Sequence, residues 1–216
     1  MEESRTETYL QKTGIPIGVD IDDTSTELAS GIHPWVIQEY ELHPSIDPFT
    51  TYDFTEGWGC SRQESIDYSF AFYRSQAHMN LPPVKGAVKA ITALAQNHPV
   101  YAITARPIQV QEETLALLAK HYPPGTFAGV YFTGQFIDDG TKVLSKLDIC
   151  RKFGIQVMVE DSLRHAMQLA PNGVATALLD YPWNQTDDLP ENAVRFTNWE
   201  DIYEWILAYE KKLQKK

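Results

Sequence analysis

The sequence predicts an α/β fold with a Rossmann-like, mostly parallel sheet, helices on both faces, and a small helical cap inserted after the first strand. From residue 84 onward, short apolar runs alternate with longer segments of helical periodicity. This alternation is typical of parallel sheets with helical crossovers. The segment 25–80 differs, because it holds ten of the chain's 25 aromatic residues. We therefore expect a core domain of residues 1–24 and 81–216, and a cap of residues 25–80.

The predicted strands are short apolar runs, each bounded by polar or turn-forming residues. The first covers residues 15–19 and ends at Asp20. The other strands are expected at residues 100–103, 129–132, 157–159, 174–179 and 193–196. Strands that alternate with helices imply a mostly parallel sheet that is covered on both faces.

Apolar residues at intervals of three or four predict those helices. The first follows the cap and covers residues 84–97. Pro107 suits the first turn of a helix over 107–121. A helix over 142–153 leads to Gly154, a residue that suits a helix C-cap.

Two further helices are predicted outside this alternation. In the cap, Ser61 followed by Glu64 forms a potential capping box for a helix over 61–78. The chain closes with an aromatic amphipathic helix over 199–213, whose lysine-rich end suits the helix dipole. This last helix either packs on its own sheet or reaches a second subunit, so a homodimer stays open.

The composition narrows the class of protein. A formal charge of −11 argues against a nucleic-acid polymer or an anionic membrane as partner. A small phosphorylated substrate stays compatible, because one metal ion reverses the local field. Two cysteines are too few for a disulfide framework. The polar N-terminus lacks a signal-peptide core, and no apolar run approaches the ~18 residues of a membrane span. We expect a cytoplasmic protein.

Acidic and hydroxyl side chains follow three of the predicted strands. Asp20 and Asp22 lie one pleat apart after the first strand, Thr104 follows the second, and Glu160 and Asp161 follow the fourth. Two carboxylates ~4 Å apart repel by about 4 kcal/mol at an effective dielectric constant of ~20, unless a cation or a proton separates them. In parallel sheets, ligands bind at the carboxyl ends of the strands. An all-oxygen site there favours Mg²⁺.

These residues resemble the four motifs of the haloacid dehalogenase-like hydrolase superfamily. The first is the D-x-D-x-T of residues 20–24, and the second is Thr104 in Ala-Ile-Thr-Ala-Arg-Pro. A lysine at a helix start and the Glu160–Asp161 pair are similar to the third and fourth. The cap, the Ile-Thr-Ala-Arg-Pro string and the sequence 180–184 resemble the 5′(3′)-deoxyribonucleotidase branch and its bacterial relatives. Two residues depart from that branch: Asp23, where glycine is more usual, and Glu160, in place of aspartate.

The resemblance implies a role for each matching residue. Asp20 would attack phosphorus and form an aspartyl-phosphate, and Asp22 would protonate the leaving alcohol and then activate water. Mg²⁺ would be held by Asp20, by Asp22 through its backbone carbonyl, and by Asp161. Glu160 would orient these ligands.

The remaining roles concern the phosphoryl group and the rest of the substrate. Thr104 would donate its hydroxyl to the phosphoryl group, and a lysine would offset its charge. Lys146 is the preferred lysine, and Lys142, one helical turn earlier, stays open. Arg106 would bind a phosphate or a base, or would be a solvated arginine at a helix start. Among the cap aromatics, Trp58 and either Phe70 or Tyr73 are the candidates to face the site.

The expected function is a Mg²⁺-dependent phosphomonoester hydrolase acting on nucleoside 5′-monophosphates. A sugar phosphate or another small phosphorylated metabolite is the alternative substrate. A non-catalytic binder of phosphorylated ligands is a further alternative, although such a protein has no need of Asp22. A phosphoryl-receiver domain also has an acidic pocket. However, its accepting Asp lies on a middle strand and it has no cap, whereas Asp20 follows the first strand.

Overall fold

A parallel sheet forms the centre of the computed structural model, which describes residues 12–134 and 144–215. In the described residues it has six strands in the order β3-β2-β1-β4-β5-β6, and every pair is parallel. The strands are β1 (Ile17–Val19), β2 (Val100–Thr104), β3 (Gly129–Phe132), β4 (Val157–Glu160), β5 (Ala175–Leu179) and β6 (Ala193–Phe196). The predicted fold class is confirmed, and β1 lies in the middle with β2 and β4 on either side.

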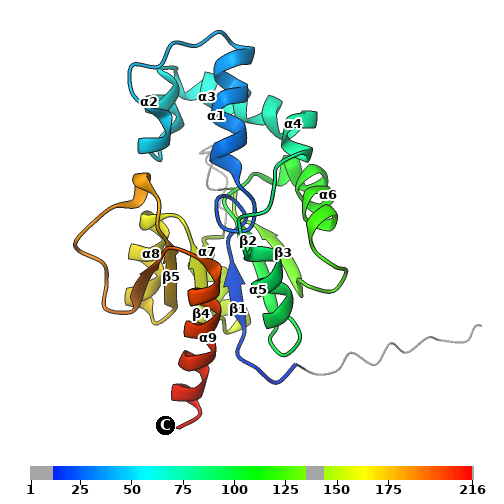
Figure 1. The fold of residues 1–216 in the computed structure, drawn as a ribbon, viewed down its shortest axis with the longest axis vertical. Coiled ribbons are helices and arrows are strands. Elements are labelled where there is room, and N and C mark those ends of the chain that lie inside the picture. The colour runs from blue at the N-terminus through cyan, green and yellow to red at the C-terminus, as the bar shows by residue number, and fades with distance from the viewer. Residues whose placement is uncertain (1–11, 135–143, 216) are drawn as a thin grey trace, which may run out of the picture.

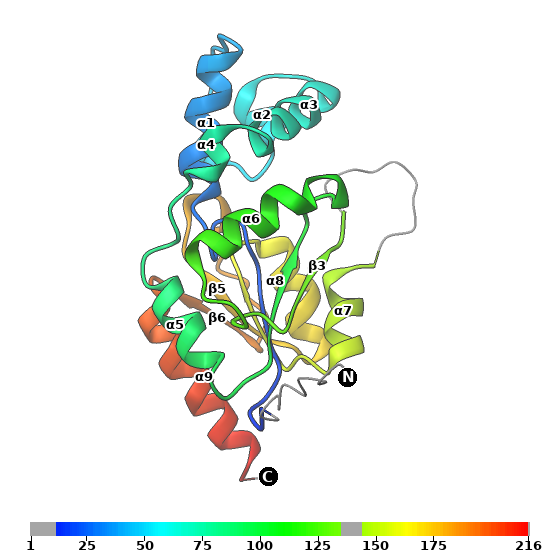
Figure 2. The ribbon, with the colours of Figure 1, turned by 90° about the vertical axis from the view of Figure 1, so that its right-hand side faces the viewer.

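Helices cover both faces of this sheet. The helices of the core are α5 (Ala87–Leu94), α6 (Gln111–His121), α7 (Lys146–Phe153), α8 (Leu163–Leu169) and α9 (Trp199–Leu213). One buried cluster joins α5, α9 and the end of α6 to one face of the sheet, and a second joins α7 and α8 to the other. Figure 2 shows α5 and α9 on one side and α7 and α8 on the opposite side. Because side chains alternate along a strand, Val157 and Val159 join the first cluster and Met158 joins the second.

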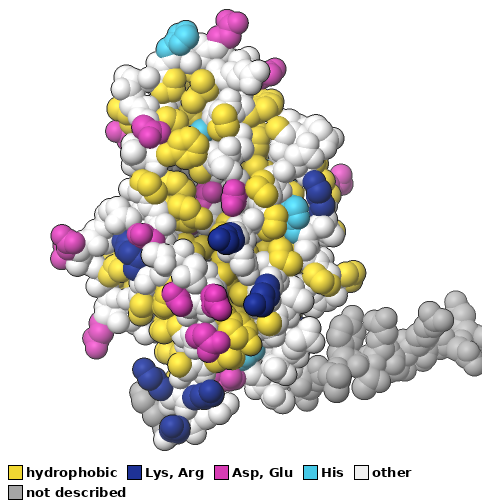
Figure 3. Space-filling model, viewed as in Figure 1, with side chains coloured by type: hydrophobic (Ala, Val, Ile, Leu, Met, Phe, Trp, Pro, Cys, Tyr) yellow, Lys and Arg dark blue, Asp and Glu magenta, His cyan; other side chains and the backbone are white. Residues whose placement is uncertain are grey.

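The cap follows β1, as predicted, and stands above the carboxyl ends of the strands (Figure 1). Its elements are α1 (Leu28–Glu39), the 3₁₀ turn Pro48–Thr50, α2 (Phe54–Trp58), α3 (Arg62–Tyr73) and α4 (Gln76–Met79). The cap has its own apolar core, which extends to Val110 and Leu117 next to and on α6. Figure 3 shows hydrophobic side chains on the visible face of the cap. Four large apolar side chains of the cap are partly exposed: Tyr40, Ile46, Phe49 and Tyr52.

The helix predicted over 61–78 is interrupted, which corrects that prediction. The capping box of Ser61 and Glu64 is present, so α3 begins where expected. It ends at Tyr73 because Ser75 adopts an extended backbone and accepts a hydrogen bond from the His78 N–H, which starts α4. A side-chain cap inside a helical pattern restarts the helix in a new direction.

Two other helix starts also differ from the prediction. Pro107 has an extended backbone and precedes a 3₁₀ turn, Ile108–Val110, so α6 begins only at Gln111. In the described part of the chain α7 begins at Lys146, after a capping box between Ser145 and Asp148. Lys142 lies outside the described residues. The predicted end of this helix is confirmed, since Gly154 is a left-handed C-cap.

The closing helix packs on its own sheet. Trp199, Ile202 and Ile206 of α9 are buried in the core cluster. The basic last turn of α9, with Lys211 and Lys212, complements the negative end of the helix dipole and is visible as dark blue side chains at the lower end of Figure 3. Within the described ranges, none of the helices has the length and apolar character required to cross a bilayer.

We predict that Ser61→Ala lowers the free energy of unfolding by about 1 kcal/mol, because the N–H of Glu64 loses its side-chain acceptor. Urea unfolding followed by circular dichroism measures the change. Gln63→Ala, an exposed site in the same helical turn, is the control and should change stability by less than about 0.5 kcal/mol. Equal losses in the two variants would contradict a role of the capping box.

Candidate active site

Residues from three strands meet at the carboxyl edge of the sheet. Asp20 follows β1, Thr104 ends β2, and Glu160 and Asp161 end and follow β4. Asp20, Glu160 and Asp161 each offer an oxygen atom within 4.8 Å of the others, and all three side chains are buried. The structure therefore brings together acidic residues that lie 140 positions apart, as the motif spacing predicts.

Lys146 lies between two of these carboxylates. Its Nζ is 2.9 Å from Asp20 Oδ1 and 2.7 Å from Glu160 Oε1, and its side chain is fully buried. Burial alone would lower the pKa of Lys146, but Asp20 and Glu160 raise it above its ordinary value. The ammonium group is therefore charged at neutral pH, and it occupies the position predicted for the motif lysine.

The acidic cluster still carries more negative charge than Lys146 balances. Burial raises the pKa of Asp20 to about 7, against the opposing effect of Lys146. Burial, together with Asp20 and Asp23, raises the pKa of Asp161 well above its ordinary value. The pKa of Glu160 is lowered, because Lys146 and His165 outweigh its burial. Oxygen ligands with an excess of negative charge suit a hard divalent cation, so Asp20, Asp161 and Glu160 fit Mg²⁺.

Asp161 and Glu160 are held in place by neighbouring side chains. Trp183 Nε1 donates to Asp161 Oδ2 at 3.0 Å, and Asn184 Nδ2 donates to the Asp161 carbonyl at 2.7 Å. His165 Nδ1 lies 3.3 Å from Glu160 Oε2. These contacts fix the carboxylates before any ligand arrives, which is the usual role of residues around a metal site.

Asp22 is held by Arg106. The guanidinium Nε lies 3.1 Å from both carboxylate oxygens, and Nη2 lies 2.6 Å from Oδ1. Nη1 contacts His78 Nε2 at 2.9 Å and donates to Thr114 at 3.0 Å. Arg106 is 1% exposed, so it is buried and is not the solvated arginine that the sequence left open. The predicted contact with a phosphate or a base stays a prediction.

Asp23, which replaces the usual glycine, has a left-handed backbone with φ of 50°. Asp and Asn adopt this conformation more easily than most residues. Both of its carboxylate oxygens accept a hydrogen bond from the N–H of Ala29, in the first turn of α1. The aspartate therefore connects the loop after β1 to the first helix of the cap, a contact that glycine cannot make.

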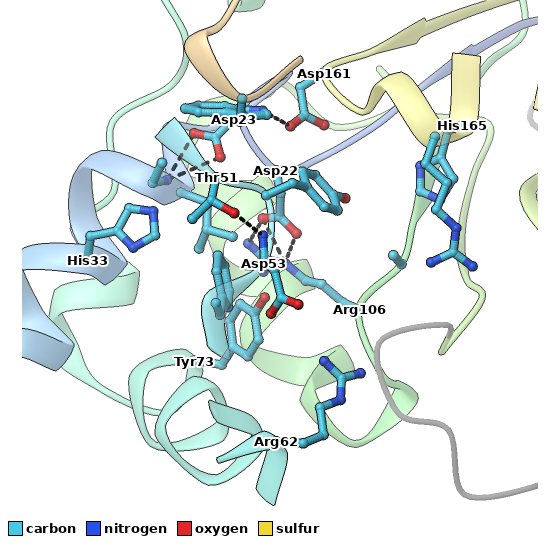
Figure 4. A pocket seen from close by; sticks show the side chains of 17 residues that line it. Asp22, Asp23, His33, Thr51, Asp53, Arg62, Tyr73, Arg106, Asp161 and His165 are labelled. Carbon is cyan, nitrogen blue, oxygen red and sulfur yellow. Dashed lines mark hydrogen bonds and ion pairs between the residues drawn. The ribbon is translucent and has the colours of Figure 1, made fainter. Parts of the chain in front are cut away.

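A cavity of about 250 Å³ lies between the cap and the core (Figure 4). Its lining includes Asp22, Asp23, Arg106 and Asp161 from the predicted site, and Tyr73 from the cap. Of the alternatives Phe70 and Tyr73, it is Tyr73 that lines the cavity, whereas Trp58 is not among the described residues that line it, so the prediction for Trp58 is wrong. Trp58 is 1% exposed and belongs to the core of the cap.

Sequence reasoning missed several other lining residues. The cap contributes His33, Thr51, Tyr52, Asp53, Phe54 and Arg62, and α8 contributes Arg164 and His165. The only available signal for Tyr52 and Phe54 was the aromatic enrichment of residues 25–80, which does not show which rings face a cavity. His33 is 2% exposed, and its residue type alone does not show that it lines a cavity.

Comparison with known sequences finds a relative that is named as a nucleotidase. No protein-family model matches the chain. A protein of Clostridium acetobutylicum named as a nucleotidase is 25% identical over 140 residues, which cover 65% of this chain and 67% of that protein.

Solved structures show the same architecture. A haloacid dehalogenase-like family hydrolase from Streptococcus pneumoniae matches with a TM-score of 0.66 and 13% identity, covering 88% of this chain and 97% of the other. A predicted phosphatase from Clostridium acetobutylicum matches with a TM-score of 0.67 and 15% identity, covering 90% and 99%. The chain therefore has the fold of the haloacid dehalogenase-like hydrolases, which confirms the resemblance seen in its motifs.

We predict that stabilisation by Mg²⁺ increases with pH up to about 7 and then levels off. In the metal-free protein the folded state binds a proton at Asp20 between pH ~4 and ~7, whereas the unfolded chain does not. The stability contributed by this proton is therefore lost as pH rises through that window. Over the same window the proton stops competing with Mg²⁺ for the Asp20 carboxylate. The raised pKa of Asp161 acts in the same direction.

Thermal unfolding at pH 5, 6, 7 and 8, with EDTA or with Mg²⁺, measures this effect. Asp161→Asn is the control, because it removes one buried negative charge and one metal ligand. It should raise the unfolding temperature in EDTA and reduce the increase caused by Mg²⁺. An increase with Mg²⁺ that is the same at every pH would contradict the prediction.

Proposed function

We propose that the protein is a Mg²⁺-dependent phosphomonoester hydrolase that works through an aspartyl-phosphate, with nucleoside 5′-monophosphates as substrates. The observation that carries the proposal is the position of Asp20, which lies at the end of the central strand beside Lys146, Glu160 and Asp161. A second carboxylate, Asp22, lines the cavity between the cap and the core together with Asp161. Two carboxylates with different surroundings can divide the roles of nucleophile and proton carrier.

The reaction has two steps. In the first, an oxygen of Asp20 attacks phosphorus, the bond between phosphorus and the ester oxygen breaks, and Asp22 gives a proton to the leaving alcohol. In the second, Asp22 takes a proton from water, the water oxygen attacks phosphorus, and inorganic phosphate leaves Asp20. Bound Mg²⁺ would supply charge neutralisation at the phosphoryl oxygens, with Asp20, Asp161 and the Asp22 carbonyl as its proposed protein ligands.

Lys146 and Thr104 would assist these steps without changing protonation. Lys146 is fixed by its two ion pairs, so its charge is already in place when negative charge develops on the phosphoryl group. The Thr104 hydroxyl accepts a hydrogen bond from the Arg106 N–H at 3.1 Å, and its own proton remains available to a phosphoryl oxygen.

Two observations support a nucleotide as substrate. The cavity is lined by aromatic side chains, including Tyr52, Phe54, Tyr73 and Trp183, against which a planar base can pack. The related protein from Clostridium acetobutylicum is named as a nucleotidase. A sugar phosphate or another small phosphorylated metabolite is the second candidate, because Arg62 and Arg164 also line the cavity and suit a leaving group with additional anionic character.

Phosphate release from a panel of substrates tests the proposal. The panel contains ribo- and deoxyribonucleoside monophosphates, sugar phosphates and phenyl phosphate, each with Mg²⁺ or with EDTA. We expect Mg²⁺-dependent turnover that falls at least ~10³-fold in Asp20→Asn, because an amide is a far weaker nucleophile than a carboxylate.

Asp22→Asn is the matched variant, since it keeps the shape of the side chain and removes the proton carrier. It should lower kcat by about 10²- to 10⁴-fold. Circular dichroism shows whether both variants are folded. A folded, Mg²⁺-binding protein with no turnover of any substrate would favour the non-catalytic alternative.

A second prediction separates two roles for Arg106. If Arg106 positions Asp22, Arg106→Lys lowers kcat by at least tenfold and changes the affinity for inorganic phosphate little, because a lysine cannot reproduce the two-point contact with the carboxylate. If Arg106 binds the phosphoryl group, the inhibition constant of inorganic phosphate rises instead. Steady-state kinetics with phosphate as a competitive inhibitor distinguish these outcomes. His121→Gln, at a contact with the Leu81 carbonyl on the side of α6, is the control for local destabilisation.

A further inference from the structure

One wall of the cavity is formed by an imidazole ring that the proposed mechanism does not use. His33, on α1, lines the cavity and is enclosed by three aromatic rings of the cap. The centroids of Phe49, Phe54 and Trp58 lie 4.9, 5.5 and 5.9 Å from its own, each with an edge-to-face geometry. Figure 4 shows His33 beside Thr51 and Asp23, at the boundary between the cap and the catalytic loop.

The hydrogen bond from Trp58 determines the tautomer of His33. The indole Nε1–H can only donate, and it lies 2.9 Å from His33 Nδ1. Nδ1 must therefore carry a lone pair, and the ring proton lies on Nε2. Burial lowers the pKa of His33 to about 4, in spite of the opposing effect of Asp47, so the ring is neutral at pH 7. The ring thus offers one N–H donor and no charge.

The other edge of the ring is directed to the cavity. The hydrogen bonds found for the described residues include one at Nδ1 of His33 and none at Nε2. Because only 2% of the residue is exposed, Nε2 has little access to solvent other than through the cavity that the residue lines. A donor fixed in this way is satisfied by a ligand acceptor or by a water molecule that the ligand displaces.

We propose that His33 is the specificity-determining residue of this cavity, donating its Nε2–H to an uncharged carbonyl oxygen on the edge of a planar heterocyclic leaving group. This inference rests on the proposed function and names a feature of its substrate. The neutral ring gives no preference for a second anionic group. An amino group at the same position is rejected, because two donors would face each other and both would lose their partners.

The neighbouring side chains agree with a planar group. Phe54 and Trp58 stack at a centroid distance of 4.5 Å, which makes the wall around His33 rigid. Tyr73 and Trp183 line other parts of the same cavity. An edge donor within aromatic walls lets stacking supply contact area while the hydrogen bond selects the substituent.

The first test compares substrates in which an oxo group beside a ring N–H replaces an amino group beside an unprotonated ring nitrogen. The pairs are the 5′-monophosphates of uridine and cytidine, and of inosine and adenosine. In one pair at least, the wild-type kcat/KM should differ by about tenfold or more in favour of the member with the oxo group. Phenyl phosphate, which has no acceptor on its ring, is the reference substrate.

The variants are chosen so that loss of the donor is separated from loss of folding. In His33→Phe with Trp58→Phe, both partners of the buried hydrogen bond are replaced by rings, so neither is left unsatisfied. We expect kcat/KM for the preferred nucleotide to fall by about 10- to 100-fold and the preference within the pair to shrink to less than about threefold. Turnover of phenyl phosphate should change by less than about threefold. Trp58→Phe alone removes the hydrogen bond that fixes the tautomer of His33, and it should give an intermediate preference within the nucleotide pair.

A measurement independent of activity uses ¹⁵N-labelled histidine and NMR. The free protein should show His33 protonated at Nε2 only, and the His33 signal should shift on addition of uridine or inosine monophosphate but not of inorganic phosphate. A ring protonated at Nδ1, or a signal that does not respond to the preferred nucleotide, would overturn the inference.

The experiments distinguish failure of the proposed function from failure of the role of His33. If phenyl phosphate and all nucleotides are left intact, the phosphatase proposal fails, and the NMR titration alone decides the role of His33. If phenyl phosphate is hydrolysed but the double variant keeps the nucleotide preference, the role of His33 is wrong and the phosphatase proposal stands. If the wild type and the double variant both prefer a substrate with a second anionic group over the nucleotides, the role of His33 is likewise overturned.

Discussion

The candidate site depends on the ion pairs that the buried Lys146 makes with Asp20 and Glu160. Five carboxylates, Asp20, Asp22, Asp23, Glu160 and Asp161, gather at one edge of the sheet, and burial raises the pKa of Asp20, Asp23 and Asp161. All except Asp161 are compensated by a nearby group: Lys146 pairs with Asp20 and Glu160, Arg106 pairs with Asp22, and a backbone N–H of α1 donates to Asp23. In the described residues Asp161 has only neutral donors, Trp183 and Asn184, and no ion pair. The uncompensated charge is therefore concentrated where a divalent cation is expected.

The topology explains how this concentration arises. Because β1 is central and β2 and β4 are its neighbours, the ends of three strands lie side by side although their residues are far apart in the chain. The positive charge of Lys146 comes from another element, the first turn of α7, where a capping box fixes the helix start after Ser145. A buried ion pair contributes little net stability, but removal of one partner leaves a buried charge and costs about 3–5 kcal/mol. The site is thus tied to the packing of α7 against the sheet.

Much of the fold and part of the site could be predicted from the sequence. Strands were predictable because each apolar run is bounded by polar or turn-forming residues, and the motif residues Asp20, Thr104 and Asp161 lie at those boundaries. Arg106 shows where such reasoning stops. Its partners Asp22, His78 and Thr114 come from the catalytic loop, the cap and α6, and no spacing reveals that they surround one guanidinium group. The cap aromatics show a second limit. Trp58 was expected at the site because it lies in the aromatic-rich segment 25–80. Its position in the core of the cap is instead set by the apolar residues that pack around it.

The same packing lets Trp58 fix the tautomer of His33. His33 lies four residues after Ala29, one turn further along the same side of α1. Ala29 is the residue that binds Asp23 of the loop after β1. His33 and the carboxylates of that loop are therefore connected through a single helical turn. Asp23 in place of glycine makes this connection possible, since it adds a side-chain contact to α1 at a position where the backbone already has a left-handed conformation. The departure from the usual motif is thus explained by the attachment of the cap and does not affect the metal ligands.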